Sequence, residues 1–88
     1  MKEARLTIGE RERHELQLHY SQTSRRIYVT LDGERKDEFR LAWAGRHETS
    51  TKFEVGQSER HQVEVRVISG IFSAEVNVIV DGKLVFTL

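Results

Sequence analysis

Four histidines, eleven glutamates and three aspartates are the side chains of this 88-residue chain that could bind a metal ion or move a proton. His14 and His19 lie five residues apart in one segment where apolar and polar residues alternate, which places them on opposite faces of a strand. Ligands on opposite faces cannot share an ion, and no His-x-His or His-x-x-x-His pair occurs. We therefore expect structural or surface roles for the histidines, and no metal site.

Most of the carboxylates alternate with apolar residues, as on the solvated face of a strand, so no acid–base pair stands out. No Gly-x-Ser-x-Gly turn frames a serine nucleophile, and no glycine-rich nucleotide-binding loop is present. The chain has no cysteine, which excludes thiolate nucleophiles, disulfides and cysteine-bound zinc. We predict that the protein is not an enzyme and has no catalytic residues, metal or cofactor.

Apolar residues recur at every second position along the whole chain, which is the pattern of half-buried strands. Polar or glycine-containing turns separate these runs, and no run has the spacing of an amphipathic helix. The pattern fits an antiparallel sandwich or a small barrel. Because the strands lack the small inward residues of a tight barrel, we predict an all-β, antiparallel β-sandwich of about seven or eight short strands, with essentially no helix. Examples of the expected inward faces are Ile27–Val29–Leu31, Phe39–Leu41–Trp43 and Val63–Val65–Val67.

Length and charge limit the organisation and the partners. Residues 1–88 are expected to form a single domain with a marginal core, to which a second subunit would add burial. Fourteen basic and fourteen acidic residues are interspersed, so we expect no nucleic-acid partner. We expect no signal peptide, because no apolar run follows Lys2, and no stretch approaches the ~18 consecutive apolar residues of a membrane span. Together with the lack of cysteine, this predicts no membrane association and a cytoplasmic location.

Two hairpins can be assigned a register by matching their apolar faces. A three-residue loop over residues 57–59 would set Phe53 opposite Val63 on the core face and Lys52 opposite Glu64 on the polar face. We predict this hairpin.

The last hairpin turns at Asp81-Gly82 and has two alternatives. A two-residue type I′ turn would leave Leu84, Phe86 and Leu88 facing water. A three-residue loop that begins one residue earlier, with Gly82 at positive φ in a β-bulge, would return them to the core face. We predict the bulged three-residue turn. In the other register, the exposed stripe would be a candidate dimer surface.

Candidate partner-binding residues are large side chains expected on an outward face, either by strand alternation or in one of the two registers of the last hairpin. Tyr28 shares its face with Thr30, and an exposed tyrosine on a sheet can bind protein or sugar. The charged run at residues 33–38 is expected to be solvated, or to form the polar rim of a partner site. The four candidates are Tyr28, Ile79, Val85 and Phe86.

The order of strands and turns resembles one repeat of the Fas apoptotic inhibitory molecule family over roughly residues 14–85. The segments that carry the resemblance are HELQLHY…SRRIYVTLDGE, FRLAWAGRHETSTKFEVG and VEVRVISGIFSAEVNVIVDGKLV. They contain an acidic-Gly turn, a Gly-[Arg/Lys]-x-Glu-Thr-like turn before an aromatic-x-Val-Gly strand, and an Ile-Ser-Gly bend before a long strand ending in Gly-Lys-Leu.

The resemblance implies a compact all-β sandwich that is soluble, intracellular and acts through protein contacts, with no cofactor or catalytic residue. Reported roles of that family are protection against cell death and against protein aggregation. Its members carry two such modules, so a single module implies that two copies associate.

We therefore expect a non-enzymatic, intracellular protein-binding module that acts through strand surfaces and has an anti-aggregation or protective role. Its expected partner is another protein or a second copy of the chain, as a homodimer. The alternative is a β-sandwich module that binds a small molecule or a carbohydrate.

Overall fold

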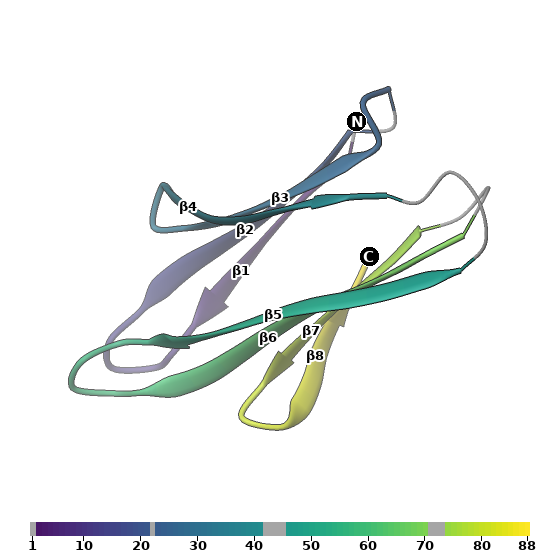
Figure 1. The fold of residues 1–88 in the computed structure, drawn as a ribbon. Coiled ribbons are helices and arrows are strands. Elements are labelled where there is room, and N and C mark those ends of the chain that lie inside the picture. The colour runs from purple at the N-terminus through teal and green to yellow at the C-terminus, as the bar shows by residue number, and fades with distance from the viewer. Residues whose placement is uncertain (1, 22, 42–45, 71–73) are drawn as a thin grey trace.

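Eight antiparallel strands make up the computed structural model, which describes residues 2–21, 23–41, 46–70 and 74–88 (Figure 1). They form two four-stranded sheets with the orders β1-β2-β3-β4 and β5-β6-β7-β8, and no helix occurs among the described residues. The predicted all-β antiparallel sandwich is confirmed. The strands are β1 (Lys2–Ile8), β2 (His14–Ser21), β3 (Arg26–Leu31), β4 (Glu34–Arg40), β5 (His47–Val55), β6 (His61–Ser69), β7 (Ala74–Val80) and β8 (Lys83–Thr87).

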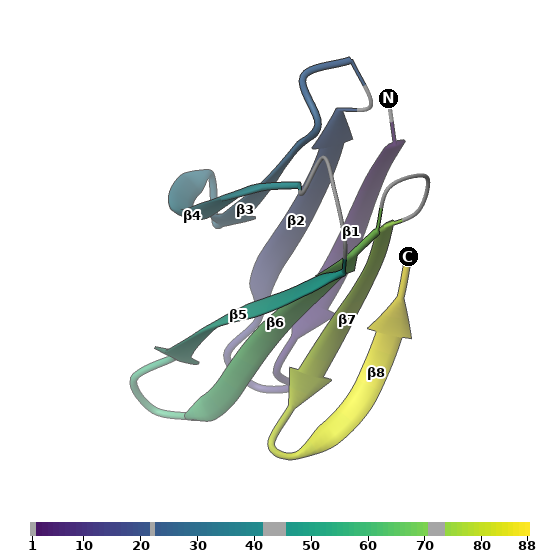
Figure 2. The ribbon, with the colours of Figure 1, turned by 45° about the vertical axis from the view of Figure 1, so that its right-hand side comes forward.

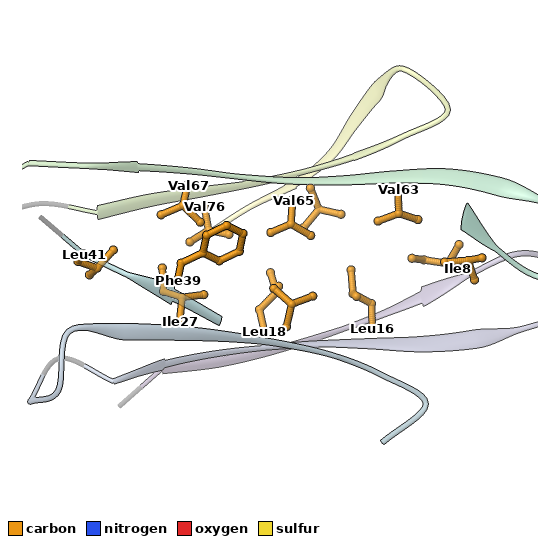
Figure 3. Close-up of a cluster of buried hydrophobic side chains, with 13 residues drawn as sticks. Ile8, Leu16, Leu18, Ile27, Phe39, Leu41, Val63, Val65, Val67 and Val76 are labelled. Carbon is orange, nitrogen blue, oxygen red and sulfur yellow. The ribbon is translucent and has the colours of Figure 1, made fainter. Parts of the chain in front are cut away.

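The two sheets face each other, and the alternating apolar residues fill the space between them (Figure 3). Leu16 and Leu18 of β2 project toward the sheet that carries Val63 and Val65 of β6. The predicted core position of Trp43 lies outside the described residues. No helix of the described part of the chain has the length and apolar character needed to cross a bilayer. The buried apolar residues are Ile8, Leu16, Leu18, Ile27, Val29, Phe39, Leu41, Val55, Val63, Val65, Val67, Val76 and Val78.

The β5–β6 hairpin has the predicted register. Lys52 pairs with Glu64 and Phe53 pairs with Val63. Pairing stops two residues later, at Val55 and His61. The connecting loop is therefore residues 56–60, which is longer than predicted, although the alignment of the strands is unchanged.

The predicted three-residue loop of the β7–β8 hairpin is wrong. Val80 pairs with Lys83 across a two-residue turn, in which Asp81 has φ 51° and Gly82 has φ 82°. Two positive φ angles are the requirement of a type I′ turn. The positive φ at Gly82 was predicted, but the positive φ at Asp81 was not. Aspartate tolerates this conformation better than most side chains because its carboxylate can hydrogen-bond locally.

A β-bulge occurs inside β8 rather than in the turn. Ile79 pairs with Leu84 and Val78 pairs with Phe86, so Val85 is the extra residue. The predicted pairing of Val78 with Leu84 is wrong. The bulge returns Phe86 to the core face, where it packs against the buried cluster, and it leaves Leu84 62% exposed and Val85 52% exposed.

The β3–β4 hairpin repeats this construction. Asp32 and Gly33 have φ 50° and 83°, and Lys36 is the extra residue because Thr30 pairs with Arg35 and Val29 with Asp37. Each sheet is a four-stranded meander that ends in a bulged hairpin with an Asp-Gly turn (Figure 1). The two halves of the chain therefore have equivalent positions, and Arg35 and Lys36 of β4 correspond to Leu84 and Val85 of β8.

Candidate functional site

Two loops lie side by side at one end of the sandwich, residues 9–13 between β1 and β2 and residues 56–60 between β5 and β6 (Figure 1). Each loop supplies a glutamate to the backbone of the other. The Glu12 carboxylate accepts hydrogen bonds from the backbone N–H groups of Gln57 and Ser58, both at 2.8 Å. We call this pair of loops, with its reciprocal hydrogen bonds, the clasp.

Glu59 makes the matching contacts in the opposite direction. Its carboxylate accepts hydrogen bonds from the backbone N–H groups of Glu10 at 2.9 Å, Arg11 at 2.7 Å and Glu12 at 3.3 Å. Converging N–H groups form a concave site that favours a negative charge. Each loop therefore binds an anion, and the anion is the side chain of the other loop.

The clasp depends on one glycine in each loop. Gly9 has φ 98° and Gly56 has φ 99°, in the region that side chains with a Cβ rarely adopt. A Cβ on Gly9 would overlap the carbonyl oxygen of Glu12, and one on Gly56 would overlap that of Glu59. The glycines allow each loop to fold closely enough to present its N–H groups.

A histidine joins each clasp glutamate to an Asp-Gly turn. His14 lies with Nε2 2.6 Å from Oε2 of Glu12 and Nδ1 2.5 Å from Oδ2 of Asp32. His61 is placed in the same way, with Nε2 2.5 Å from Glu59 and Nδ1 2.6 Å from Asp81. Asp81 was predicted only as part of a bend, whereas its carboxylate is also a partner of His61.

Each aspartate also fastens its turn to the neighbouring strand. Oδ1 of Asp32 accepts from the N–H of Glu15 at 2.8 Å, and the N–H of Asp32 donates to the Glu15 carbonyl at 2.8 Å. Asp81 repeats the exchange with Gln62, at 2.9 and 2.8 Å. These contacts hold the aspartates in the left-handed conformation that the type I′ turn requires.

The network shifts the pKa values of its members. The hydrogen bond that His14 makes to Asp32, followed by the one it makes to Glu12, raises the pKa of His14, and the bonds to Asp81 and Glu59 raise the pKa of His61 in the same order. The histidine contact, followed by the backbone N–H donors, lowers the pKa of Glu12 and of Glu59 to about 2. The carboxyl pKa of each aspartate is also lowered, first by its histidine. These shifts, together with a carboxylate oxygen beside each ring nitrogen, favour an imidazolium between two carboxylates.

This arrangement suits a structural role better than catalysis. Each imidazolium donates both ring N–H groups, so neither nitrogen is free to accept a proton from a substrate or to bind a metal. Within the described parts of the chain, no group of three or more His, Cys, Asp or Glu side chains is arranged to hold a metal ion.

The sequence contains a signal for the clasp that an inspection of single histidines missed. The motif Gly-x-x-Glu-Arg-His begins at Gly9 and again at Gly56, and an apolar-Asp-Gly turn follows in each half at residues 31–33 and 80–82. A repeated motif at a fixed spacing is typical of repeated structural units. Aligning the two halves would have brought the histidines, glutamates and aspartates together.

The four predicted partner-binding residues lie in different environments. Tyr28 is on β3, and the guanidinium carbon of Arg35 lies 4.3 Å from the centroid of its ring. Phe86 packs against the core, whereas Ile79 lies opposite Leu84 on the outer face of the other sheet. Ile79 and Val85 are thus the two candidates beside an exposed leucine, since Leu84, which was not among the four, pairs with Ile79 and precedes Val85 in β8. We call Ile79, Leu84 and Val85 the β8 patch.

The β8 patch lies along an open strand edge. β8 pairs with β7 and with no other described strand, and Figure 2 shows its free edge at the margin of the sheet. Val85 also lines a groove between this hairpin and the clasp, together with Val80, Lys83 and Arg11. The equivalent groove of the other half has Lys36 and Glu34 in place of Val85 and Lys83. The two halves therefore share an architecture and differ in the polarity of this surface.

Comparison with known proteins adds no relative, since no family model, curated protein or solved structure matches the chain.

Proposed function

We propose that the protein is a non-enzymatic, intracellular protein-binding module whose contact surface is the β8 patch. The observation that carries this proposal is the exposure of two adjacent aliphatic side chains, Leu84 and Val85, on an open strand edge. Among the described residues they are the only large apolar side chains with most of their surface in water. Apolar groups beside unpaired backbone groups favour association with another polypeptide.

The equivalent strand of the other half indicates that the fold does not require apolar residues there. β4 carries Arg35 and Lys36 at the positions of Leu84 and Val85, in the same bulged hairpin. Charged side chains on an edge strand prevent unwanted pairing. Because β4 has this protection and β8 lacks it, a binding role is the simplest physical reason for the sequence KLVFT in β8.

A protective role against aggregation is part of the proposal. Unfolding proteins expose apolar segments and strand edges, and the β8 patch offers matching groups to both. The resemblance to the Fas apoptotic inhibitory molecule family supports the same role and the intracellular location, and it remains a prediction.

Carbohydrate binding at Tyr28, the alternative function, has less support. Sugars bind to tyrosine through the open face of the ring. Arg35 lies over that ring at 4.3 Å, so this face is already in contact with a cation. We therefore place protein binding first.

Aggregation of insulin reduced with dithiothreitol provides the test. The reductant unfolds insulin at ambient temperature, and it leaves this chain unchanged because the chain has no cysteine. We expect the protein, in molar excess, to suppress the rise in light scattering. The double variant Leu84→Lys/Val85→Lys should lose this suppression, whereas Lys36→Ser, at the equivalent bulge of β4, should retain it.

Amide chemical-shift spectra of both variants would show that the fold is retained. Absence of suppression by the unmodified protein, or equal suppression by the double variant, would count against the proposal. A glycan titration that shifts the amide signals around Tyr28 would favour the alternative.

A further inference from the structure

We infer that a second copy of this chain occupies the β8 patch, with the β8 strands of the two copies antiparallel about a twofold axis. The two sheets β5-β6-β7-β8 would then join into one continuous sheet of eight strands. This inference rests on the proposed function, because it names the partner of the same surface.

Charge distinguishes β8 from the other three described edge strands. Charged side chains along an edge hinder pairing between sheets, and β1, β4 and β5 all carry several of them. β8 carries a single charge, at Lys83. The chain as a whole has no net charge, so no long-range repulsion opposes the approach of two copies. The charged residues of the other edges are Glu3 and Arg5 of β1, Glu34, Arg35, Lys36, Asp37, Glu38 and Arg40 of β4, and Glu48, Lys52 and Glu54 of β5.

The backbone of β8 determines which residues can pair across the axis. Leu88 exchanges two hydrogen bonds with Val76, at 2.8 and 3.3 Å, so the preceding residue, Thr87, directs its N–H and C=O toward the open edge. Lys83 closes the turn with Val80, which leaves the backbone groups of Leu84 at the same edge.

If Leu84 of one copy pairs with Thr87 of the other, the backbone N–H and C=O groups that both residues direct to the open edge form hydrogen bonds. Thr87 lies opposite Asn77 and Leu84 lies opposite Ile79, both on the outer face, so the paired side chains would also share a face. Val85 of each copy would then lie beside the twofold axis. Lys83 would face Leu88 of the other copy, so no like charges would oppose each other.

The bulge favours a second copy over an unrelated strand. A bulge bends a strand and increases its twist, so a regular strand fits poorly against β8. A second β8 carries the same extra residue and the same twist. Because only a five-residue strand pairs, the interface is small, and we expect a weak, reversible dimer.

Sedimentation equilibrium of the full chain between about 5 µM and about 1 mM tests this inference. We expect a reversible monomer–dimer equilibrium, and Leu84→Arg should weaken it at least about tenfold. The absence of native cysteine allows a second measurement. Val85→Cys should form an intermolecular disulfide under mild oxidation, and Lys36→Cys, the matched control on β4, should not.

A monomer throughout this concentration range would overturn the inference. So would a dimer that Leu84→Arg leaves intact, or equal disulfide yields from Val85→Cys and Lys36→Cys. Any of these results combined with patch-dependent suppression of insulin aggregation would leave the proposed function standing with a different partner. A dimer through β8 with no effect on insulin would support the inference and count against the protective role.

Discussion

The carboxylate of Glu59 caps the backbone of the loop that contains Glu12, and the carboxylate of Glu12 caps the loop that contains Glu59. The two loops belong to different sheets, so this exchange joins the halves of the sandwich at one end. It is polar and lies at the surface, unlike the apolar contacts that join the sheets elsewhere.

Glu59→Gln is expected to lower the melting temperature by several degrees. The neutral amide has one acceptor oxygen in place of two and no charge for the N–H groups of the opposite loop or for His61. Glu54→Gln is the control, because Glu54 is exposed and its nearest ion-pair partner, Arg60, lies 3.7 Å away. Thermal unfolding followed by circular dichroism measures both. Equal melting temperatures for Glu59→Gln and the unmodified protein would contradict a stabilising clasp.

The stability should be greatest between about pH 4.5 and 6.5. Folding raises the pKa of His14 and His61, so their contribution is complete below the ordinary value of 6.5 and is lost as the pH rises through the folded value. Folding lowers the pKa of Glu12 and Glu59 to about 2, so their contribution is complete above 4.5 and is lost as the pH falls toward 2. Urea unfolding at a series of pH values would measure this profile.

Histidine variants test whether His14 and His61 cause the decline in stability at higher pH. His14→Gln/His61→Gln should unfold at lower urea concentration near pH 5.5 and should lose most of the decline in stability above about pH 6.5. His47→Gln changes an exposed histidine outside the clasp and should keep the full profile. An unchanged decline in the double variant would show that other groups cause it.

Alanine at the clasp glycines should be more damaging than alanine at the turn glycines. Gly33 and Gly9 both have positive φ, but a Cβ on Gly33 meets nothing within 4 Å, whereas one on Gly9 overlaps the Glu12 carbonyl. We expect Gly33→Ala to cost about 1–2 kcal/mol from backbone strain alone. Gly9→Ala should cost more than about 3 kcal/mol, because the loop must also move. Equal losses in urea unfolding would mean that the loop relaxes freely.

Truncation of a core leucine should destabilise the protein far more than truncation of a leucine in the β8 patch. Leu18 is completely buried, so Leu18→Ala should destabilise the protein by about 3 kcal/mol, through lost burial and the cavity left behind. Leu84→Ala should change the unfolding free energy by less than about 0.5 kcal/mol in dilute monomer, because Leu84 is 62% exposed. A large loss from Leu84→Ala would assign this side chain to the core.

The strands and their faces could be predicted because alternation is a local pattern. The pairing of Phe53 with Val63 follows from matching two such patterns across one loop. The last hairpin could not be predicted in this way. Its two-residue turn has Asp81 at positive φ, with the carboxylate in contact with Gln62 and His61 of a neighbouring strand, and apolar alternation contains no information about that contact.

The clasp joins residues that are far apart in the sequence, and this has a consequence for the order of folding. The N–H groups of residues 10–12 receive their acceptor from residue 59, which is synthesised almost fifty residues later. On a growing chain, the N–H groups of the β1–β2 loop therefore lack this acceptor until the second meander has been synthesised. Contacts of this separation slow folding, because the intervening chain must be ordered before they form. During that time the first half of the protein is exposed to non-native contacts, because Glu59, the acceptor for the N–H groups of its loop, is not yet present.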